Sequence, residues 1–132
     1  MRTVREHAEV SRRGDLARAI GDASTTACVL AQARDRVASA HAAVEAAVHA
    51  RHGLPTATQI ALAERFIARQ RRNLLAAREA EVAAQLAHDQ VEGEVAAARV
   101  RLGRARADRE VIERHFAKWR TDQARRRENA AD

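Results

Sequence analysis

A heptad pattern runs without interruption through the second half of this 132-residue chain. Steps of three and four residues from Ile60 to Trp119 meet an apolar side chain at fourteen of eighteen positions. Because these steps keep side chains on one line of a helix, the pattern predicts a single long helix with one contact line, here called the long seam. Its positions are Ile60, Ala63, Ile67, Gln70, Leu74, Ala77, Glu81, Ala84, His88, Val91, Val95, Ala98, Leu102, Ala105, Arg109, Ile112, Phe116 and Trp119.

A shorter pattern with the same spacing occupies the first half of the chain. Steps of four and three from Leu16 meet apolar residues at eight of ten positions, although only 46% of the chain is hydrophobic. Continued backwards, the steps meet only charged side chains, so we predict that this short seam ends at Leu16. The charged positions are Arg13, Glu9, Glu6 and Arg2, and the short seam consists of Leu16, Ile20, Ala23, Ala27, Leu30, Arg34, Val37, His41, Val44 and Val48.

Six positions within the two seams are polar. A polar side chain in a seam penalises misaligned pairing, so we expect these residues to fix the register of the two helices. They are Arg34, His41, Gln70, Glu81, His88 and Arg109.

The stretch RHGLPTATQIA, residues 51–61, separates the two seams. Gly53 can end a helix in the left-handed conformation, Pro55 cannot continue one, and Thr56 with Gln59 has the spacing of a capping box. These signals predict one helix over about 4–51, a turn at 52–56 and a second helix over about 57–127. Gly14, Gly21 and the Ser-Thr-Thr run at 24–26 are poor helix formers, so we expect the first helix to be weakened near 14–26.

Two long helices joined by a short turn lie antiparallel. We therefore predict an all-α fold in which residues 1–132 form one long antiparallel two-helix coiled-coil hairpin. Folding about residue 54 sets Val48 beside Ile60 and Leu16 near residue 92. The long seam from Val95 to Trp119 then has no partner in the short seam, and this C-terminal part of the second helix overhangs.

The overhanging part of the long seam is roughly 37 Å long at the usual rise of a helix. Residues 1–14 are one candidate to cover part of it, through Val4, Ala8 and Val10. An open apolar stripe of this length is otherwise unexpected on an isolated protein. The pattern therefore favours self-association or docking to another protein, with Phe116 and Trp119 as anchors.

The net charge of +6 is concentrated near the C-terminus. Residues 99–127 hold ten Arg and one Lys against four acidic residues, which gives +7 for this segment alone. Three interpretations remain: a solvated mixed-charge face, docking to an acidic protein surface, or binding of nucleic-acid phosphates. Acids at 108, 110, 113 and 122 and the lack of a nucleic-acid-binding motif make the third the least favoured.

Catalytic motifs are missing from the sequence, which has no glycine-rich phosphate loop, no G-x-S-x-G and no H-E-x-x-H. We therefore predict a protein that is not an enzyme and has no cofactor. His49 and His52 lie one turn apart but lack further ligands, so we expect no metal site there. Cys28 is the only cysteine and is expected to be buried. No apolar run is long enough to span a membrane, which predicts a cytoplasmic protein.

The combination of unequal helices, an overhanging basic end and no active site resembles the FliJ/YscO group of bacterial stalk proteins. These proteins serve flagellar and type III secretion export ATPases. The resemblance rests on the Gly53–Pro55 turn after a first helix that fills over a third of the chain, on the long seam, and on the C-terminal stretch HFAKWRTDQARRREN.

The resemblance implies a coiled-coil stalk that binds and stimulates a hexameric export ATPase. In that group the paired ends of the hairpin sit in the ATPase ring, and the protein also contacts an export-gate protein and substrate chaperones at the cytoplasmic face of the apparatus. The implied ATPase-facing residues are Leu102, Ile112, Phe116, Trp119, Arg120, Arg125, Arg126 and Arg127. Those implied near the turn, facing the gate, are His49, His52, Ile60, Phe66 and Ile67.

Two other functions fit the sequence. The C-terminal parts of two long seams could pair in a structural homodimer, which predicts a stable dimer, whereas a stalk is expected to be a monomer or weak dimer. Alternatively, the arginines could make the C-terminal helix a nucleic-acid binder.

Overall fold

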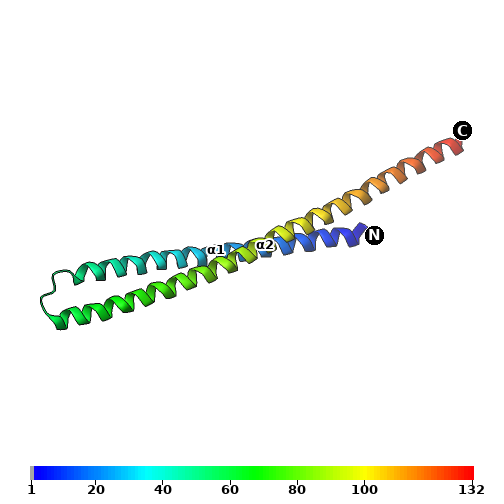
Figure 1. The fold of residues 1–132 in the computed structure, drawn as a ribbon. Coiled ribbons are helices and arrows are strands. Elements are labelled where there is room, and N and C mark those ends of the chain that lie inside the picture. Colours follow the sequence, from blue (N-terminus) through cyan, green and yellow to red (C-terminus); the bar gives the residue numbers. More distant parts are fainter. Residues whose placement is uncertain (1) are drawn as a thin grey trace. The chain divides into compact units, whose positions relative to one another are not determined.

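The computed structural model describes residues 2–132, and over these residues the protein is all-α. Helix α1 spans Arg2–Arg51 and helix α2 spans Ala57–Ala131, with one turn between them (Figure 1). The predicted fold class is thus confirmed. Helix α1 continues without a break through Gly14 and Gly21, within the segment expected to be weakened. A glycine costs a helix only about 1 kcal/mol, which contacts with a second helix can offset.

The turn forms as its residues predict. Gly53 adopts a positive φ of 83°, and the backbone N–H of Leu54 donates to the Arg51 carbonyl at 3.4 Å. On the other side, the Thr56 hydroxyl accepts a hydrogen bond from the backbone N–H of Gln59 at 3.2 Å. Since Thr56 satisfies a donor that the first turn of a helix leaves unpaired, it caps α2.

The substitution Gly53→Ala is expected to lower the free energy of unfolding by about 1 kcal/mol, because a Cβ is disfavoured at this φ. Gly103→Ala is the matched control: it lies inside α2 with open space around it, and alanine there should stabilise by up to about 1 kcal/mol. Thermal and urea unfolding followed by circular dichroism measures both. Equal shifts of the same sign for the two variants would contradict this account of the turn.

The chain divides into two compact units. Unit 1 consists of Met1–Gly21 with Gly93–Asp132, and unit 2 of Asp22–Glu92. Unit 2 is an antiparallel helical hairpin that includes the turn. Its core contains Leu30, Ala33 and Ala84 in one cluster, together with Ala47, Ile67 and Leu74.

The pairing of the helices in unit 2 differs from a fold-back about residue 54. The Arg51 guanidinium hydrogen-bonds the Glu64 carboxylate, and Thr26 contacts His88. In both contacts the residue on α2 lies more than one helical turn beyond the position that the fold-back predicts. Because α1 ends level with Glu64, the residues at the start of α2 lie beside the connecting segment 52–56 and not beside α1. This explains why Ile60, the first position of the long seam, is 41% exposed.

The long seam is confirmed as the contact line of α2. Every one of its positions from Ala63 to Ile112 is buried or half-buried, whereas the residues between them are exposed with the exception of Gln85. The sequence pattern therefore predicts the orientation of α2 about its own axis correctly over this length.

The prediction of the short seam is correct for only one of the two positions in each heptad. The first residue of each predicted heptad pair is buried or half-buried, namely Leu16, Ala23, Leu30, Val37 and Val44. For the second residue of each pair, the side chain that faces α2 is the one directly before the predicted residue. The half-buried or buried residues are Ala19, Thr26, Ala33, Ala40 and Ala47, whereas Ile20, Ala27, Arg34 and His41 are exposed and Val48 is half-buried. Small side chains at these positions let the helices approach closely. Cys28, expected to be buried, is exposed.

Unit 1 contains the N-terminal part of α1 and the C-terminal part of α2. Val95, Ala98 and Leu102 are buried there, at 4%, 2% and 6% exposure. The first part of the long seam beyond Val95 is therefore covered, as expected if residues 1–14 pack on it. Residues 2–21 supply the partner, but Val4 and Val10 are exposed, and the buried residue among them is Glu9.

Candidate docking surface

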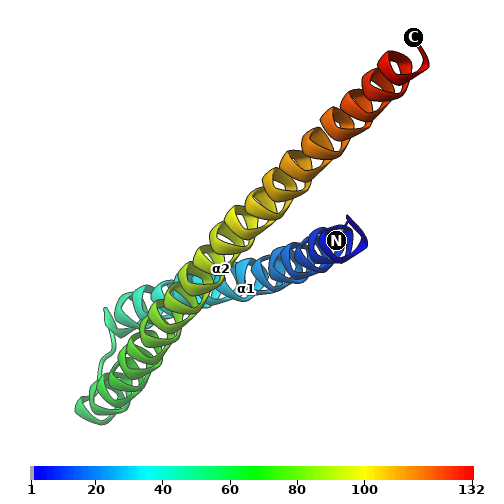
Figure 2. The same ribbon diagram turned by 90° about the vertical axis from the view of Figure 1, so that its right-hand side faces the viewer.

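The part of α2 beyond Ile112 extends past the N-terminal end of α1 in both views of unit 1 (Figures 1 and 2). Ile112 is half-buried, and the next two seam residues, Phe116 and Trp119, are 45% and 56% exposed. We call Ile112, Phe116 and Trp119 the C-terminal stripe. Leu102, predicted to face the same partner, is buried inside unit 1 and does not belong to this surface.

The two aromatic residues of the C-terminal stripe form one continuous surface. Their rings stack at 5.8 Å between centroids with 23° between the planes. The guanidinium of Arg120 lies 5.0 Å from the centre of the Phe116 ring. Stacking and the cation–π contact together hold the rings in place before any partner arrives, which lowers the entropy lost on binding.

The predicted arginines Arg125, Arg126 and Arg127 are exposed and lie in the last turns of α2. Arg126 continues the line of the C-terminal stripe, because it is seven residues beyond Trp119. Within the described residues, none of these three arginines has an ion pair with the chain's own acids. The stripe is therefore an apolar anchor followed directly by unpaired positive charge, which favours a partner with acidic groups beside an apolar pocket.

The residues predicted near the turn do not form one surface. Ile67 is 1% exposed and belongs to the core of unit 2, so it is not available to a partner. Phe66 is 44% exposed and stacks with the Arg69 guanidinium at 5.5 Å. His49 and His52 are exposed and meet edge to face at 6.3 Å between ring centroids. Their surroundings supply no further ligand, and across residues 2–132 no three His, Cys, Asp or Glu side chains are grouped to hold a metal.

A polar contact between Thr26 and His88 lies inside unit 2. The Thr26 hydroxyl is 2.9 Å from Nδ1 of His88 and 3.1 Å from the Ala23 carbonyl oxygen. A hydroxyl carries one proton and a carbonyl only accepts, so both contacts are hydrogen bonds when Thr26 donates to Ala23 and His88 donates to Thr26. The contact joins α1 to α2 through His88, one of the polar seam residues expected to fix the register.

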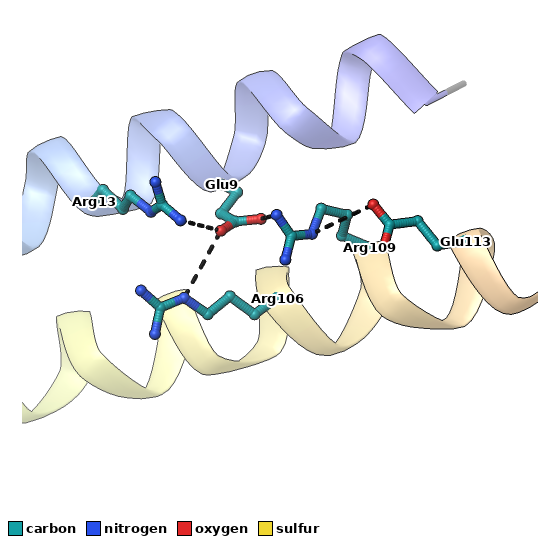
Figure 3. Close-up of polar contacts among 5 residues, drawn as sticks. All are labelled: Glu9, Arg13, Arg106, Arg109 and Glu113. Atoms are coloured by element: carbon teal, nitrogen blue, oxygen red, sulfur yellow. Dashed lines mark hydrogen bonds and ion pairs between the residues drawn. The ribbon is translucent and has the colours of Figure 1, made fainter.

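Glu9 is the centre of a charged cluster in unit 1 that the sequence pattern did not identify (Figure 3). Its carboxylate, 3% exposed, lies 2.7 Å from Arg13 Nη2, 3.7 Å from Arg106 Nε and 2.9 Å from Arg109 Nη1. We call these four residues the Glu9 cluster. The backward extension of the short seam passes through Glu9, which indicates that the contact between the helices continues beyond Leu16 through charges.

Within the Glu9 cluster, Arg109 also approaches a second acid. Its Nε lies 3.9 Å from the Glu113 carboxylate one turn along α2. Glu9 Oε2 and Arg109 Nε are both buried atoms without a hydrogen-bond partner. Each is held by an ion pair instead, Glu9 Oε2 with Nη1 of Arg109 and Arg109 Nε with the Glu113 carboxylate. Arg109 was expected to fix the register as a polar seam residue, and Glu9 is its partner.

The described part of the chain holds no helix long and apolar enough to cross a membrane. Searches of protein-family models, curated proteins and solved structures find no match to this chain.

Proposed function

We propose that this chain is a non-enzymatic coiled-coil stalk that docks on a hexameric export ATPase through its C-terminal stripe. The observation that carries the proposal is the exposure of Phe116 and Trp119 on the same line as the buried Val95, Ala98 and Leu102. The contact line of a coiled coil is here continued, with its largest side chains, into a part of α2 that extends beyond the described part of α1 in unit 1. A second protein is the natural source of the missing contact.

The charge of the C-terminal segment supports a different protein as the partner, in preference to a second copy of the chain. Residues 99–127 carry +7, so pairing the C-terminal stripes of two copies brings two strongly basic segments together. That repulsion opposes a homodimer at moderate salt, whereas an acidic rim around apolar pockets attracts the same segment.

The assignment to an export ATPase rests on the resemblance to the FliJ/YscO group. In such an arrangement the stripe of α2 enters the centre of the ring, and Arg120 and Arg125–Arg127 meet acidic groups of the ring. The exposed residues near the turn, His49, His52, Ile60 and Phe66, are then available to an export-gate protein. The stalk is peripheral to the membrane, at the cytoplasmic face of the apparatus.

The direct test adds the purified chain to the export ATPase of the same bacterium. The expected result is faster ATP hydrolysis and a larger fraction of hexamer in light scattering, saturating at one chain per ring. The rival states give different readings: a stable dimer of the chain alone indicates a homodimer, and a salt-sensitive shift of RNA indicates a nucleic-acid binder. The proposal is abandoned if the ATPase shows neither faster hydrolysis nor more hexamer.

A further inference from the structure

A groove distinct from the C-terminal stripe and the Glu9 cluster lies between the two helical segments of unit 1. Its volume is about 380 Å³, within the range of pockets that hold small ligands. We call it the arginine groove, because four of its seven lining residues are arginines. It is lined by Arg5, Ala8 and Arg12 from α1 and by Arg101, Arg104, Ala105 and Asp108 from α2.

Positive charge in the arginine groove is only partly balanced by the acids of the described residues. Asp108 is the one acid that lines it, and its carboxylate is 3.8 Å from Arg5 Nη1. Arg12 reaches Asp15, outside the lining, at 3.4 Å. No acid of the described residues forms an ion pair with Arg101 or Arg104. The groove therefore keeps a surplus of two positive charges on α2.

This surplus opposes the contact between the two segments of unit 1. Arg5 and Arg12 on α1 line the same concavity as Arg101 and Arg104 on α2, and like charges that face one another repel. An anion bound between them reverses the sign of this interaction, because each guanidinium then attracts the shared ligand. Such an anion would also fasten residues 2–21 to α2.

We propose that the arginine groove binds a compact, multiply charged phosphate anion, namely a diphosphate or triphosphate group. Arginines line it from both helices, and the planar donor pairs of guanidinium groups match phosphate oxygens. Several negative charges on one small group balance the surplus better than the single charge of a carboxylate. No aromatic residue lines the groove, so a nucleobase has no stacking surface there and the phosphates carry the affinity.

The proposal is tested by calorimetric titration of the full chain with sodium pyrophosphate, ADP and adenosine at about 0.15 M salt, where exposed charges are screened. Pyrophosphate and ADP are expected to bind with similar affinity, which identifies the diphosphate as the recognised group, and adenosine is not expected to bind. Inorganic pyrophosphate should also raise the midpoint of thermal unfolding.

The substitutions Arg101→Gln and Arg104→Gln together are expected to weaken pyrophosphate binding by about tenfold or more, because they remove two charged donors. Both side chains are exposed and unpaired in the described structure, so folding should be preserved. The matched control, Arg125→Gln with Arg127→Gln, removes the same charge from exposed positions outside the groove and should change the affinity by less than about twofold.

Three results would overturn the proposal. The first is no heat of binding for pyrophosphate or ADP. The second is an equal loss of affinity in the two double variants, which would mean that only the net charge of the chain attracts the anion. The third is single-stranded RNA binding far more tightly than pyrophosphate, with the same dependence on both pairs of arginines. That result would reassign the groove to a nucleic-acid surface.

Discussion

Replacing Phe116 and Trp119 together with alanine is expected to weaken binding to the export ATPase by about a hundredfold or more, since each buried aromatic anchor contributes about 2 kcal/mol or more. The free chain should be almost unaffected. Both rings are about half exposed and contact mainly each other and Arg120, so their loss leaves no cavity in unit 1. Binding is measured by calorimetry or surface plasmon resonance, and stability by thermal unfolding.

A control for this double variant is Val100→Ala with Val111→Ala. These valines are 54% and 51% exposed on the same part of α2 but lie off the line of the C-terminal stripe. Removing them should leave ATPase binding within about twofold of the unaltered chain, because exposed apolar residues outside a docking surface contribute little. Equal losses of affinity in the two double variants would show that general hydrophobicity, and not the stripe, attracts the ATPase.

The same stripe allows the homodimer to be tested independently. Trp119→Asp places a charge on the contact line and should abolish any dimer of the chain that forms through the C-terminal stripe. Light scattering of the unaltered chain is expected to show a monomer or weak dimer at low salt, because the basic segments repel. A tight dimer that Trp119→Asp dissociates would favour the structural homodimer and contradict the ATPase proposal.

The orientation of α2 was predictable because large apolar residues occupy its contact line at almost every turn. Ile67, Leu74, Val95 and Leu102 leave only one frame that buries all of them, and the structure buries all four. The position of the turn was equally clear. Gly53 and Thr56 have conformational and capping roles that few other residue types perform.

The orientation of α1 was harder to predict because alanine is common on every side of it. At four of the five second heptad positions an alanine stands directly before a larger residue, such as Ala19 before Ile20. Counting apolar residues favours Ile20, but close packing favours alanine, and the structure leaves Ile20 47% exposed. Size complementarity between the two helices decides this choice, and one helix's sequence does not contain it.

The candidate site was predicted in part for similar reasons. Phe116 and Trp119 are exposed as expected, because they lie beyond the end of α1. Leu102 is not, since residues 2–21 cover the seam there with Glu9 as their buried residue. A rule that ends a seam at its first charged residues misses a contact made of opposite charges. Arg109, already noted as polar within the long seam, was the available signal that an acid on α1 would face it.

Replacing Glu9 with glutamine is expected to destabilise unit 1 by about 2 kcal/mol. Removing one partner of a buried ion pair costs about 3–5 kcal/mol, and the smaller figure applies here because the arginines stay partly hydrated. Their side chains are 55%, 50% and 33% exposed for Arg13, Arg106 and Arg109, against 3% for Glu9. Three arginines then remain around a neutral amide, and their mutual repulsion pushes residues 2–21 away from α2.

The Glu9→Gln effect should be local, so amide hydrogen exchange is the decisive measurement. Protection of residues 2–21 is expected to fall by about thirtyfold, the equivalent of 2 kcal/mol, with little change around Ile67 in unit 2. Glu110→Gln serves as the control, because it makes the same change of charge at an exposed position of the same unit. If Glu9→Gln leaves this protection unchanged, the charged contact does not hold the N-terminal segment. If instead protection falls as expected, residues around Val95 and Leu102 should exchange faster with it, because the buried part of the long seam then becomes accessible.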